Sequence, residues 1–225
     1  MLGYAKNMKI VNLSESVSVL DEYLRETRDQ NIQKDRMRFV KNLERIGVIS
    51  GYEISKEFEY SNTETQTPVA MAKTNTLAAQ PVISTVIRAG LPLMNGFLQV
   101  FDKADSAFLA AYRQLDKDGV METVMGYASC PDLTGRPLII ADTMIATGTT
   151  IVDAYNKLLQ YGQPSHVFVS GVIVSRPAIE FIEAHIPTMT LYAAAIDDEL
   201  NDQFFIVPGL GDAGDISYGE KHELS

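Results

Sequence analysis

The sequence predicts an α/β protein: a single domain with a central, mainly parallel sheet flanked by helices, an N-terminal helical arm and a C-terminal loop-rich hood. Beyond residue 80, short β-branched apolar runs alternate with amphipathic segments of helical periodicity. A chain of 225 residues with 46% hydrophobic content is long enough to fill one core. No Pro- or Gly-rich linker divides it, so we treat 1–225 as one domain.

Residues 1–50 form the predicted helical arm. Between Ser14 and Gly47 the apolar residues recur at helical spacing, with Val17, Leu20 and Leu24 on one face and Phe39, Leu43 and Ile46 on another. We expect Ser14 or Ser16 to cap the first helix and Gly47 to end the second. Alternation of polar and apolar residues in 51–60 and 67–72 predicts a pair of strands next.

From Pro81 onward the sequence alternates between strand and helix patterns. The predicted strands are 81–87, 106–113, 121–130, 136–142, 166–175 and 190–196, and the predicted helices are 91–101, 151–162 and 176–186. Pro92 falls in the first turn of its helix, where proline is tolerated. Helices between successive strands favour parallel pairing with helices on both faces of the sheet.

Composition and charge exclude several classes of function. A formal net charge of −10 argues against general nucleic-acid binding. The single cysteine, Cys130, excludes an internal disulfide framework, and the three histidines show no metal-ligand spacing, so no protein-held metal is expected. No apolar run approaches the ~18 residues of a membrane-spanning helix, and no secretory signal is expected. These features predict a cytoplasmic protein without a membrane partner.

The acidic residues concentrate near the C-terminus. Residues 190–225 carry one base, Lys221, and eight acids, which we expect to form a solvated surface. The acids are Asp197, Asp198, Glu199, Asp202, Asp212, Asp215, Glu220 and Glu223. An anionic ligand would therefore need specific arginines or a metal ion to overcome this background locally.

The segment 138–159 carries the clearest chemical signal. A buried strand is predicted to end at Asp142, and a helix is predicted to begin eight residues later, after a Thr-rich loop containing Gly148. Backbone N–H groups, hydroxyls and the partial positive charge of a helix N-terminus would make an anion site suited to a phosphate. Asp142 could accept two sugar hydroxyls or hold a metal-bound water. An ordinary strand–loop–helix connection with Thr caps is the alternative.

A second Gly-rich segment is not a dinucleotide-binding motif. Residues 209–214 match G-x-G-x-x-G, but only eleven residues follow Gly214, so no βαβ unit can be completed. We predict a loop whose backbone can approach a flat ligand closely.

Two arginines stand at predicted strand ends. Arg88 follows the strand 81–87, and Arg113 ends the strand 106–113. Ligands of open α/β sheets bind beyond the carboxyl ends of the strands. A single arginine at a strand end is usually a solvated surface residue. Two arginines at equivalent strand ends, beside a phosphate-type loop, instead favour the binding of a polyphosphate ligand.

Together these segments resemble the uracil phosphoribosyltransferase family of the type I phosphoribosyltransferases. The family shows Ile-Leu-Arg-Ala-Gly, Met-Tyr-Arg, Asp-Pro-Met-Leu-Ala-Thr-Gly-Gly-Ser and Pro-Gly-Leu-Gly-Asp-Ala-Gly-Asp in this order. The chain has Val-Ile-Arg-Ala-Gly at 86–90, Ala-Tyr-Arg at 111–113, Asp-Thr-Met-Ile-Ala-Thr-Gly-Thr-Thr at 142–150 and the last element unchanged at 208–215. The resemblance covers roughly 14–219 and includes Leu24-Arg25-Glu26 in the arm.

The resemblance implies transfer of the 5-phosphoribosyl group from phosphoribosyl pyrophosphate to N1 of uracil, giving UMP and pyrophosphate. It implies catalytic roles for Asp142, Asp212 and Arg113. The implied residues for phosphoribosyl pyrophosphate are Arg88, Arg113, Asp142, Thr143, Met144, Ile145, Ala146, Thr147, Gly148, Thr149, Thr150 and Asp212, and those for uracil are Ile206, Gly211, Asp212 and Ala213, within a base-binding loop at 200–219.

The resemblance further implies Mg²⁺ bound mainly through phosphoribosyl pyrophosphate, a homodimer or higher homo-oligomer, and a loop at 113–125 that covers the donor. Uracil and phosphoribosyl pyrophosphate are the expected small-molecule partners.

The chain departs from the family pattern at a few positions. Thr143 replaces a Pro, Thr149-Thr150 replace Gly-Ser, and Pro92 and Asn95 replace a Gly and an Asp. A β-branched Thr149 does not readily take the positive φ open to glycine, so an altered phosphate loop is expected. Phe205 stands where Tyr is common, and Ile216 where a basic residue is common. A non-catalytic regulator of the same fold, or an enzyme for a purine or orotate, are therefore the alternatives.

Overall fold

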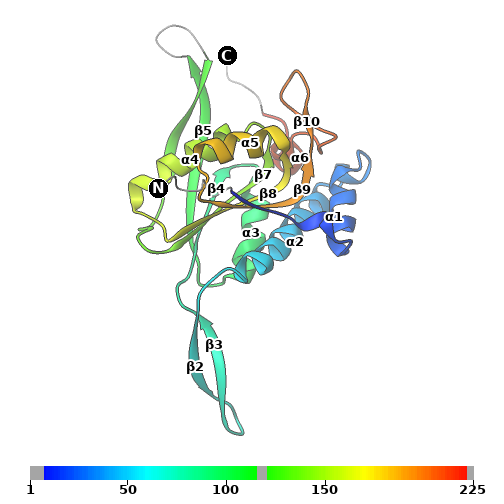
Figure 1. Ribbon diagram of the computed structural model, residues 1–225. Helices are drawn as coiled ribbons and strands as arrows, with labels where there is room; N and C mark the ends of the chain where they lie inside the picture. Colours follow the sequence, from blue (N-terminus) through cyan, green and yellow to red (C-terminus); the bar gives the residue numbers. More distant parts are fainter. Residues whose placement is uncertain (1–7, 116–120, 222–225) are drawn as a thin grey trace, which may run out of the picture.

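A seven-stranded sheet lies at the centre of the computed structural model, which describes residues 8–115 and 121–221 (Figure 1). The spatial order is β1 (Lys9–Asn12), β9 (Thr190–Asp197), β8 (His166–Ser175), β7 (Pro137–Ile145), β4 (Val82–Ile87), β5 (Asp105–Leu115) and β6 (Met121–Ser129). Neighbouring strands run parallel throughout, except that β6 returns antiparallel to β5. The predicted α/β class with a mainly parallel sheet is therefore confirmed.

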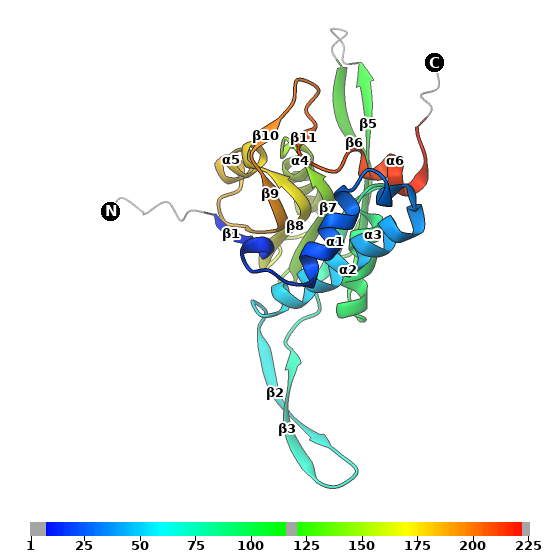
Figure 2. The same cartoon turned by 90° about the vertical axis from the view of Figure 1, so that its right-hand side faces the viewer.

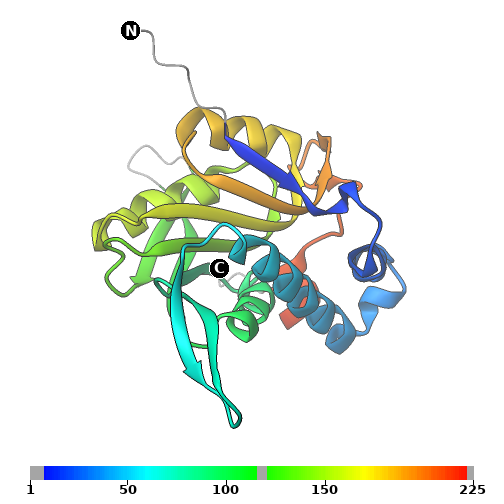
Figure 3. The ribbon, with the colours of Figure 1, turned by 60° about the horizontal axis from the view of Figure 1, so that its bottom comes forward.

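Helices cover both faces of the sheet (Figure 3). One face carries α1 (Val19–Arg28), α2 (Arg36–Ser55) and α3 (Leu91–Val100), and the other carries α4 (Thr149–Leu158) and α5 (Arg176–His185). The alternation along β7 shows why, because Leu138 and Ile140 pack with α4 and α5 while Ile139 and Ala141 pack on the opposite side.

The N-terminal arm differs from the prediction in three respects. It begins with β1, which pairs with β9 and extends the sheet. The cap of α1 is neither Ser14 nor Ser16 but Ser18, whose hydroxyl accepts from the Leu20 N–H while its own N–H donates to Asp21. Val17 is 95% exposed and takes no part in the helical face.

Gly47 does not end a helix, because α2 continues through it to Ser55. A side chain at Gly47 would collide with the Leu93 carbonyl oxygen, and one at Gly96 would collide with the backbone of α2. These glycines let α2 and α3 approach closely, which local sequence signals cannot distinguish from a helix stop.

A long antiparallel hairpin follows α2. Its strands are β2 (Tyr60–Gln66) and β3 (Met71–Leu77), so a strand pair is present, but both strands lie later in the sequence than predicted. Residues 51–55 belong to α2, and the predicted ranges 51–60 and 67–72 overlap the observed strands only at 60 and 71–72. The hairpin projects from the amino-terminal end of the sheet, away from the body (Figure 2).

The opposite, carboxyl end of the sheet carries the C-terminal hood. The hood contains β10 (Glu199–Leu200) paired with β11 (Ile206–Val207), and then α6 (Ala213–Tyr218). The ribbon formed by β5 and β6 rises at the same end (Figure 2). Three short 3-10 helices, η1 (Leu13–Glu15), η2 (Ile32–Lys34) and η3 (Leu159–Tyr161), complete the described elements.

Two strands are longer than predicted. The strand β7 runs past Asp142 to Ile145, so the loop before α4 has three residues rather than eight. The strand β5 runs past Arg113 to Leu115. The central part of the covering loop predicted at 113–125 lies outside the described residues, and its flanks belong to β5 and β6.

Candidate active site

The predicted site segments meet at the carboxyl end of the sheet. Arg88 directly follows β4, Asp142 lies in β7, and Asp197 ends β9. Parallel pairing of these strands through β8 brings their carboxyl ends to one edge, and the hood lies at the same edge (Figure 2). The structure thus brings together segments separated by more than a hundred residues of sequence.

The phosphate-type loop is residues 146–148. Gly148 takes φ +81° as the N-cap of α4 and packs against the Ala178 carbonyl oxygen of α5, where a Cβ would lie 3.0 Å away. The Ser175 hydroxyl donates to the Ala146 carbonyl and also accepts from the Ala178 N–H at 2.9 Å, which ties the loop to the start of α5. The Ile151 N–H donates to the Gly148 carbonyl at 3.2 Å, and the N–H groups before it, of Thr149 and Thr150, are the ones suited to an anion.

Thr149 does not alter this loop. It is the first residue of α4, it is exposed, and Gly148 alone carries the left-handed conformation here. The Thr147 and Thr149 hydroxyls lie 2.8 Å apart, and Thr150 is partly exposed. The expectation of an altered loop is therefore wrong in its reason, because the second Gly of the family pattern corresponds to a helical position.

Asp142 is the carboxylate of β7. Its Oδ1 accepts from the Thr143 N–H at 2.7 Å. Burial raises the pKa of Asp142 to about 7, although the N–H groups of Thr143 and Met144 act to lower it. The raised pKa of a carboxyl at the edge of a ligand site is typical of a functional group.

The side chains after Asp142 divide between site and core. The fully buried Thr143 hydroxyl donates to the Ala89 carbonyl at 2.7 Å, which joins β7 to the turn after β4. Ile145 packs in the core beneath α4 and α5, while Met144 packs against the opposite cluster. Thr143 and Ile145 can therefore serve a ligand only through their backbone groups.

Arg88 is held by the hood. One terminal guanidinium nitrogen, Nη2, donates to Asp215 Oδ1 at 2.8 Å and to the Gly219 carbonyl. The Arg88 Nε is buried and has no hydrogen-bond partner among the described residues. A buried donor without a partner is costly, so it fits a site that an anion completes.

Gly214 brings α6 against the Arg88 turn. A Cβ at Gly214 would lie 3.2 Å from Asp212 Oδ1, 3.6 Å from the Ala89 Cβ and 3.8 Å from the Arg88 Nε. Asp212 itself caps α6 by accepting from the Asp215 N–H at 3.0 Å. Arg88 and Asp212, which were both predicted to bind phosphoribosyl pyrophosphate, thus lie close together around Gly214.

The base loop alternates buried and exposed residues. Ile206 and Ala213 are buried, whereas Gly211 and Asp212 are exposed. Gly211 takes φ +96°, and a Cβ there would meet only the Ile216 side chain, at 3.6 Å. The backbone at Gly211 is therefore accessible, and its contact with a flat ligand stays a prediction.

An ion pair that contacts the base loop was missed by sequence reasoning. Arg28 of α1 forms a two-point ion pair with Asp197, and both contact Gly209 of the base loop. Asp197 is only 7% exposed, so its assignment to a solvated acidic surface is wrong. No local signal could have found a pair separated by 169 residues.

Arg113 lies in β5 opposite Thr123, and its side chain is outside the described set. Asn95 and Phe205 are exposed. Burial raises the pKa of the Cys130 thiol to about 11, which leaves it a poor nucleophile.

Two features are absent from the described residues, a cluster of metal-ligating side chains and a membrane-spanning helix. No group of three or more His, Cys, Asp or Glu side chains is placed to hold a metal ion within 8–115 and 121–221. Over the same ranges, none of the helices is long and apolar enough to cross a membrane.

Comparison with known proteins gives a consistent result. The family model described as uracil phosphoribosyltransferase matches residues 16–219. A uracil phosphoribosyltransferase of Porphyromonas gingivalis is 40% identical over 215 residues, covering 95% of this chain and 100% of the relative. One of Pyrococcus furiosus is 36% identical over 209 residues, covering 91% and 88%. A solved structure from Aquifex aeolicus has a TM-score of 0.81 at 28% identity, covering 93% and 98%.

Proposed function

Since this chain belongs to the uracil phosphoribosyltransferase family, we propose that the carboxyl end of its sheet is where it transfers the 5-phosphoribosyl group of phosphoribosyl pyrophosphate to N1 of uracil. The chain is a pentosyltransferase whose products are UMP and pyrophosphate. The observation that supports this location best is the convergence of Arg88, Asp212 and the base loop around Gly214.

The segment 142–150 would hold the phosphoribosyl group. The 5-phosphate would bind the loop 146–148 and the first-turn N–H groups of α4, with the hydroxyls of Thr147, Thr149 and Thr150 beside it. Asp142 would accept hydrogen bonds from the ribose hydroxyls, which favours its ionised form. Met144, Ile145 and Ala146 would contribute backbone contacts.

Arg88 and Arg113 would bind the pyrophosphate. Breaking the glycosidic bond builds positive charge on the ribose and negative charge on the leaving pyrophosphate. A guanidinium placed beforehand beside the leaving group stabilises that charge more as the bond breaks. The partnerless Nε of Arg88 supports this role, and Asp212 would lie beside the reacting ribose.

Uracil would bind the loop 206–213. Its edge offers O2, N3–H and O4, which backbone N–H and C=O groups of Ile206, Gly211 and Ala213 can match without charged side chains. The positions of these groups are fixed by the buried side chains of Ile206 and Ala213. A base with a different polar edge would leave a buried group unpaired, which is the physical basis of selectivity.

Mg²⁺ fits this site only as an ion carried by the substrate. The described residues offer no three-carboxylate cluster, and Mg²⁺ commonly takes one or two carboxylates together with substrate phosphates. Asp142 and Asp212 are the carboxylates that would assist in holding it. When bound, the ion would neutralise charge on the pyrophosphate.

We also propose that the enzyme acts in the cytoplasm as a homodimer or larger homo-oligomer. A single cysteine agrees with a reducing compartment. The projecting β2–β3 hairpin supports self-association, because a two-stranded hairpin is marginally stable alone in water. Sedimentation of the full chain tests the assembly, and a monomer at micromolar concentration would contradict it.

The function is tested with a panel of bases. Purified protein, Mg²⁺ and phosphoribosyl pyrophosphate are mixed separately with uracil, cytosine, orotate, hypoxanthine and adenine, and the nucleotide products are quantified. We expect UMP from uracil and no product from the other four. Absence of UMP, or an equal yield from another base, would overturn the assignment.

A further inference from the structure

The contact between Arg28 and Asp197 differs from an ordinary surface ion pair. Arg28 Nη1 and Nη2 donate to the two carboxylate oxygens of Asp197, each at 2.8 Å. The side chains are 24% and 7% exposed, whereas the neighbouring pair Arg176–Asp198 is 60% and 73% exposed. A pair this enclosed costs desolvation and persists only where its remaining hydrogen-bonding capacity is also satisfied.

The remaining hydrogen bonds of Arg28 and Asp197 are made with the backbone of Gly209 in the base loop. The Gly209 N–H donates to Asp197 Oδ2 at 2.8 Å, and the Gly209 carbonyl accepts from Arg28 Nη1 at 3.0 Å. Burial acts to raise the pKa of Asp197, but the Arg28 guanidinium and the Gly209 N–H outweigh it and hold that pKa below its ordinary value. The carboxylate therefore stays charged and engaged.

The position of Gly209 makes this contact matter for the loop. Gly209 takes φ +58°, and a Cβ there would collide with the Ile206 carbonyl, so the chain folds back on itself at this residue. Its neighbours Ile206 and Leu210 are buried in the same cluster as Leu20 and Leu24 of α1. Two residues after Gly209, the backbone of Gly211 is exposed.

We propose that Arg28 and Asp197 are positioning residues for base recognition, which hold the Gly209 peptide from both sides and thereby set the backbone that faces uracil. The proposal rests on the proposed function of the loop 206–213. It gives the N-terminal arm a part in the uracil site, although none of the residues predicted to bind a substrate belongs to the arm. Neither side chain needs to touch uracil, because both act through the loop.

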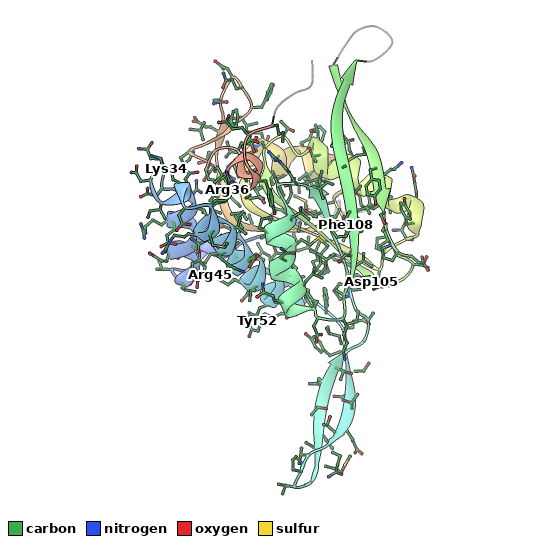
Figure 4. The ribbon with its side chains drawn as sticks, turned by 180° about the vertical axis from the view of Figure 1, so that it is seen from behind. Lys34, Arg36, Arg45, Tyr52, Asp105 and Phe108 are labelled. Atoms are coloured by element: carbon green, nitrogen blue, oxygen red, sulfur yellow. The ribbon has the colours of Figure 1, made fainter. Side chains whose placement is uncertain are left out.

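A second arm contact supports the same arrangement. Arg36, at the start of α2, donates through its Nε to the Ile216 carbonyl of α6 at 3.1 Å (Figure 4). The arm thus holds the hood at Gly209, before the exposed residues Gly211 and Asp212, and at Ile216, after them. A segment fixed on both sides has less freedom to misalign its hydrogen-bonding groups.

The test compares substitutions in the pair with a matched control. Arg28→Met and Asp197→Asn remove one partner, Arg28→Lys keeps the charge but loses the two-point fork, and Arg28→Met/Asp197→Leu removes both charges. Arg176→Met is the control, since it makes the same chemical change in an exposed Arg–Asp pair at the same end of the sheet. Steady-state kinetics are measured with each substrate varied in turn, together with thermal unfolding.

We expect the single substitutions to lower kcat/KM for uracil by about 10- to 100-fold, because small misplacements of a binding group have effects of this size. The KM for phosphoribosyl pyrophosphate should stay within about twofold, and Arg28→Lys should retain part of the lost activity. The double variant should recover thermal stability but not uracil use. Equal losses toward both substrates, or full recovery of uracil use in the double variant, would show a merely structural pair.

Hydrogen exchange separates this proposal from the proposed function. Amides of 206–213 should exchange faster in Arg28→Met than in the wild type or in Arg176→Met, whether or not the chain makes UMP. Unchanged protection of that segment would refute the positioning role. If the wild type made no UMP, the function would be wrong while the exchange measurement still decided the role of the pair.

Discussion

Replacing Asp142 with Asn is expected to abolish a pH step in the use of phosphoribosyl pyrophosphate. Burial raises the pKa of Asp142 to about 7 in the free protein. An ionised carboxylate can accept hydrogen bonds from two ribose hydroxyls, whereas a protonated one spends one oxygen as a donor. Donor binding therefore selects the ionised form, and it should strengthen as the pH rises through neutrality.

The size of the step follows from the pKa. With a pKa of about 7, about 10% of the molecules carry ionised Asp142 at pH 6 and about 90% at pH 8. If only the ionised form binds productively, the apparent affinity scales with that fraction. The KM for phosphoribosyl pyrophosphate should then fall about tenfold between these two pH values.

The assay is UMP formation at saturating uracil from pH 6 to pH 8, with phosphoribosyl pyrophosphate varied. Phosphate groups also titrate, with a pKa of about 6, so the substrate contributes its own pH dependence. The Asp142→Asn enzyme shares that contribution and serves as the reference. Parallel pH profiles for the wild type and the variant, or a KM that rises with pH in the wild type alone, would refute the assigned role.

The same substitution should stabilise the fold at high pH. The folded pKa of Asp142 lies above the unfolded value of 3.8, so its contribution is fully present below about pH 4 and is lost as the pH rises through 7. Three pKa units correspond to about 4 kcal/mol. The side chain is partly exposed, so we expect about 2 kcal/mol, or a Tm gain of about 4–8 °C at pH 8 and none at pH 4.

Three other substitutions test separate parts of the structure. Arg88→Ala should raise the KM for phosphoribosyl pyrophosphate about 10- to 100-fold while shifting Tm by less than about 4 °C, because its pair with Asp215 is about one-third exposed; equal losses of stability and activity would contradict this. Gly47→Ala should lower stability by about 2 kcal/mol or more in denaturant unfolding, since its Cβ would collide with Leu93; an unchanged midpoint would contradict the close approach of the helices. Ser18→Ala should cost about 1 kcal/mol through loss of the cap of α1, with UMP formation unchanged.

The strands β4 to β9 and the helices α3 to α5 could be predicted because their signals are local, whereas β10, β11 and α6 lie in a segment that was predicted to be a loop. The apolar runs of β4, β8 and β9 are short and almost wholly buried, and each amphipathic helix between them has one clear apolar face. Glycine was the misleading residue. In the sequence, Gly47 and Gly148 both resemble residues that mark a helix boundary. In the structure, Gly47 allows a close approach between two helices, and Gly148 supplies a left-handed N-cap. The different roles of the two glycines depend on contacts with segments distant in the sequence, and hydrophobic periodicity carries no information about such contacts.

The site was predictable in outline and not in detail for the same reason. The residue types and their positions at strand ends indicate a phosphate site, and the resemblance supplies the base loop. The direction of the Thr143 hydroxyl depends on the Ala89 carbonyl, which belongs to another strand connection. Asp197 reads as one acid among eight in the tail because its arginine lies 169 residues away.

The acidic side chains at the carboxyl end of the sheet are largely compensated by neighbouring groups. Asp197 and Asp215 each form an ion pair with an arginine. Burial raises the pKa of Asp142 to about 7, so this carboxyl is partly protonated at neutral pH, and Asp212 accepts from an N–H group in the first turn of α6. These four carboxylates are thus paired, partly protonated or held by a helix amide. An anionic phosphoribosyl donor can therefore approach the α4 N-terminus and the Arg88 Nε, which has no partner in the described part of the chain, with less repulsion than a net charge of −10 suggests.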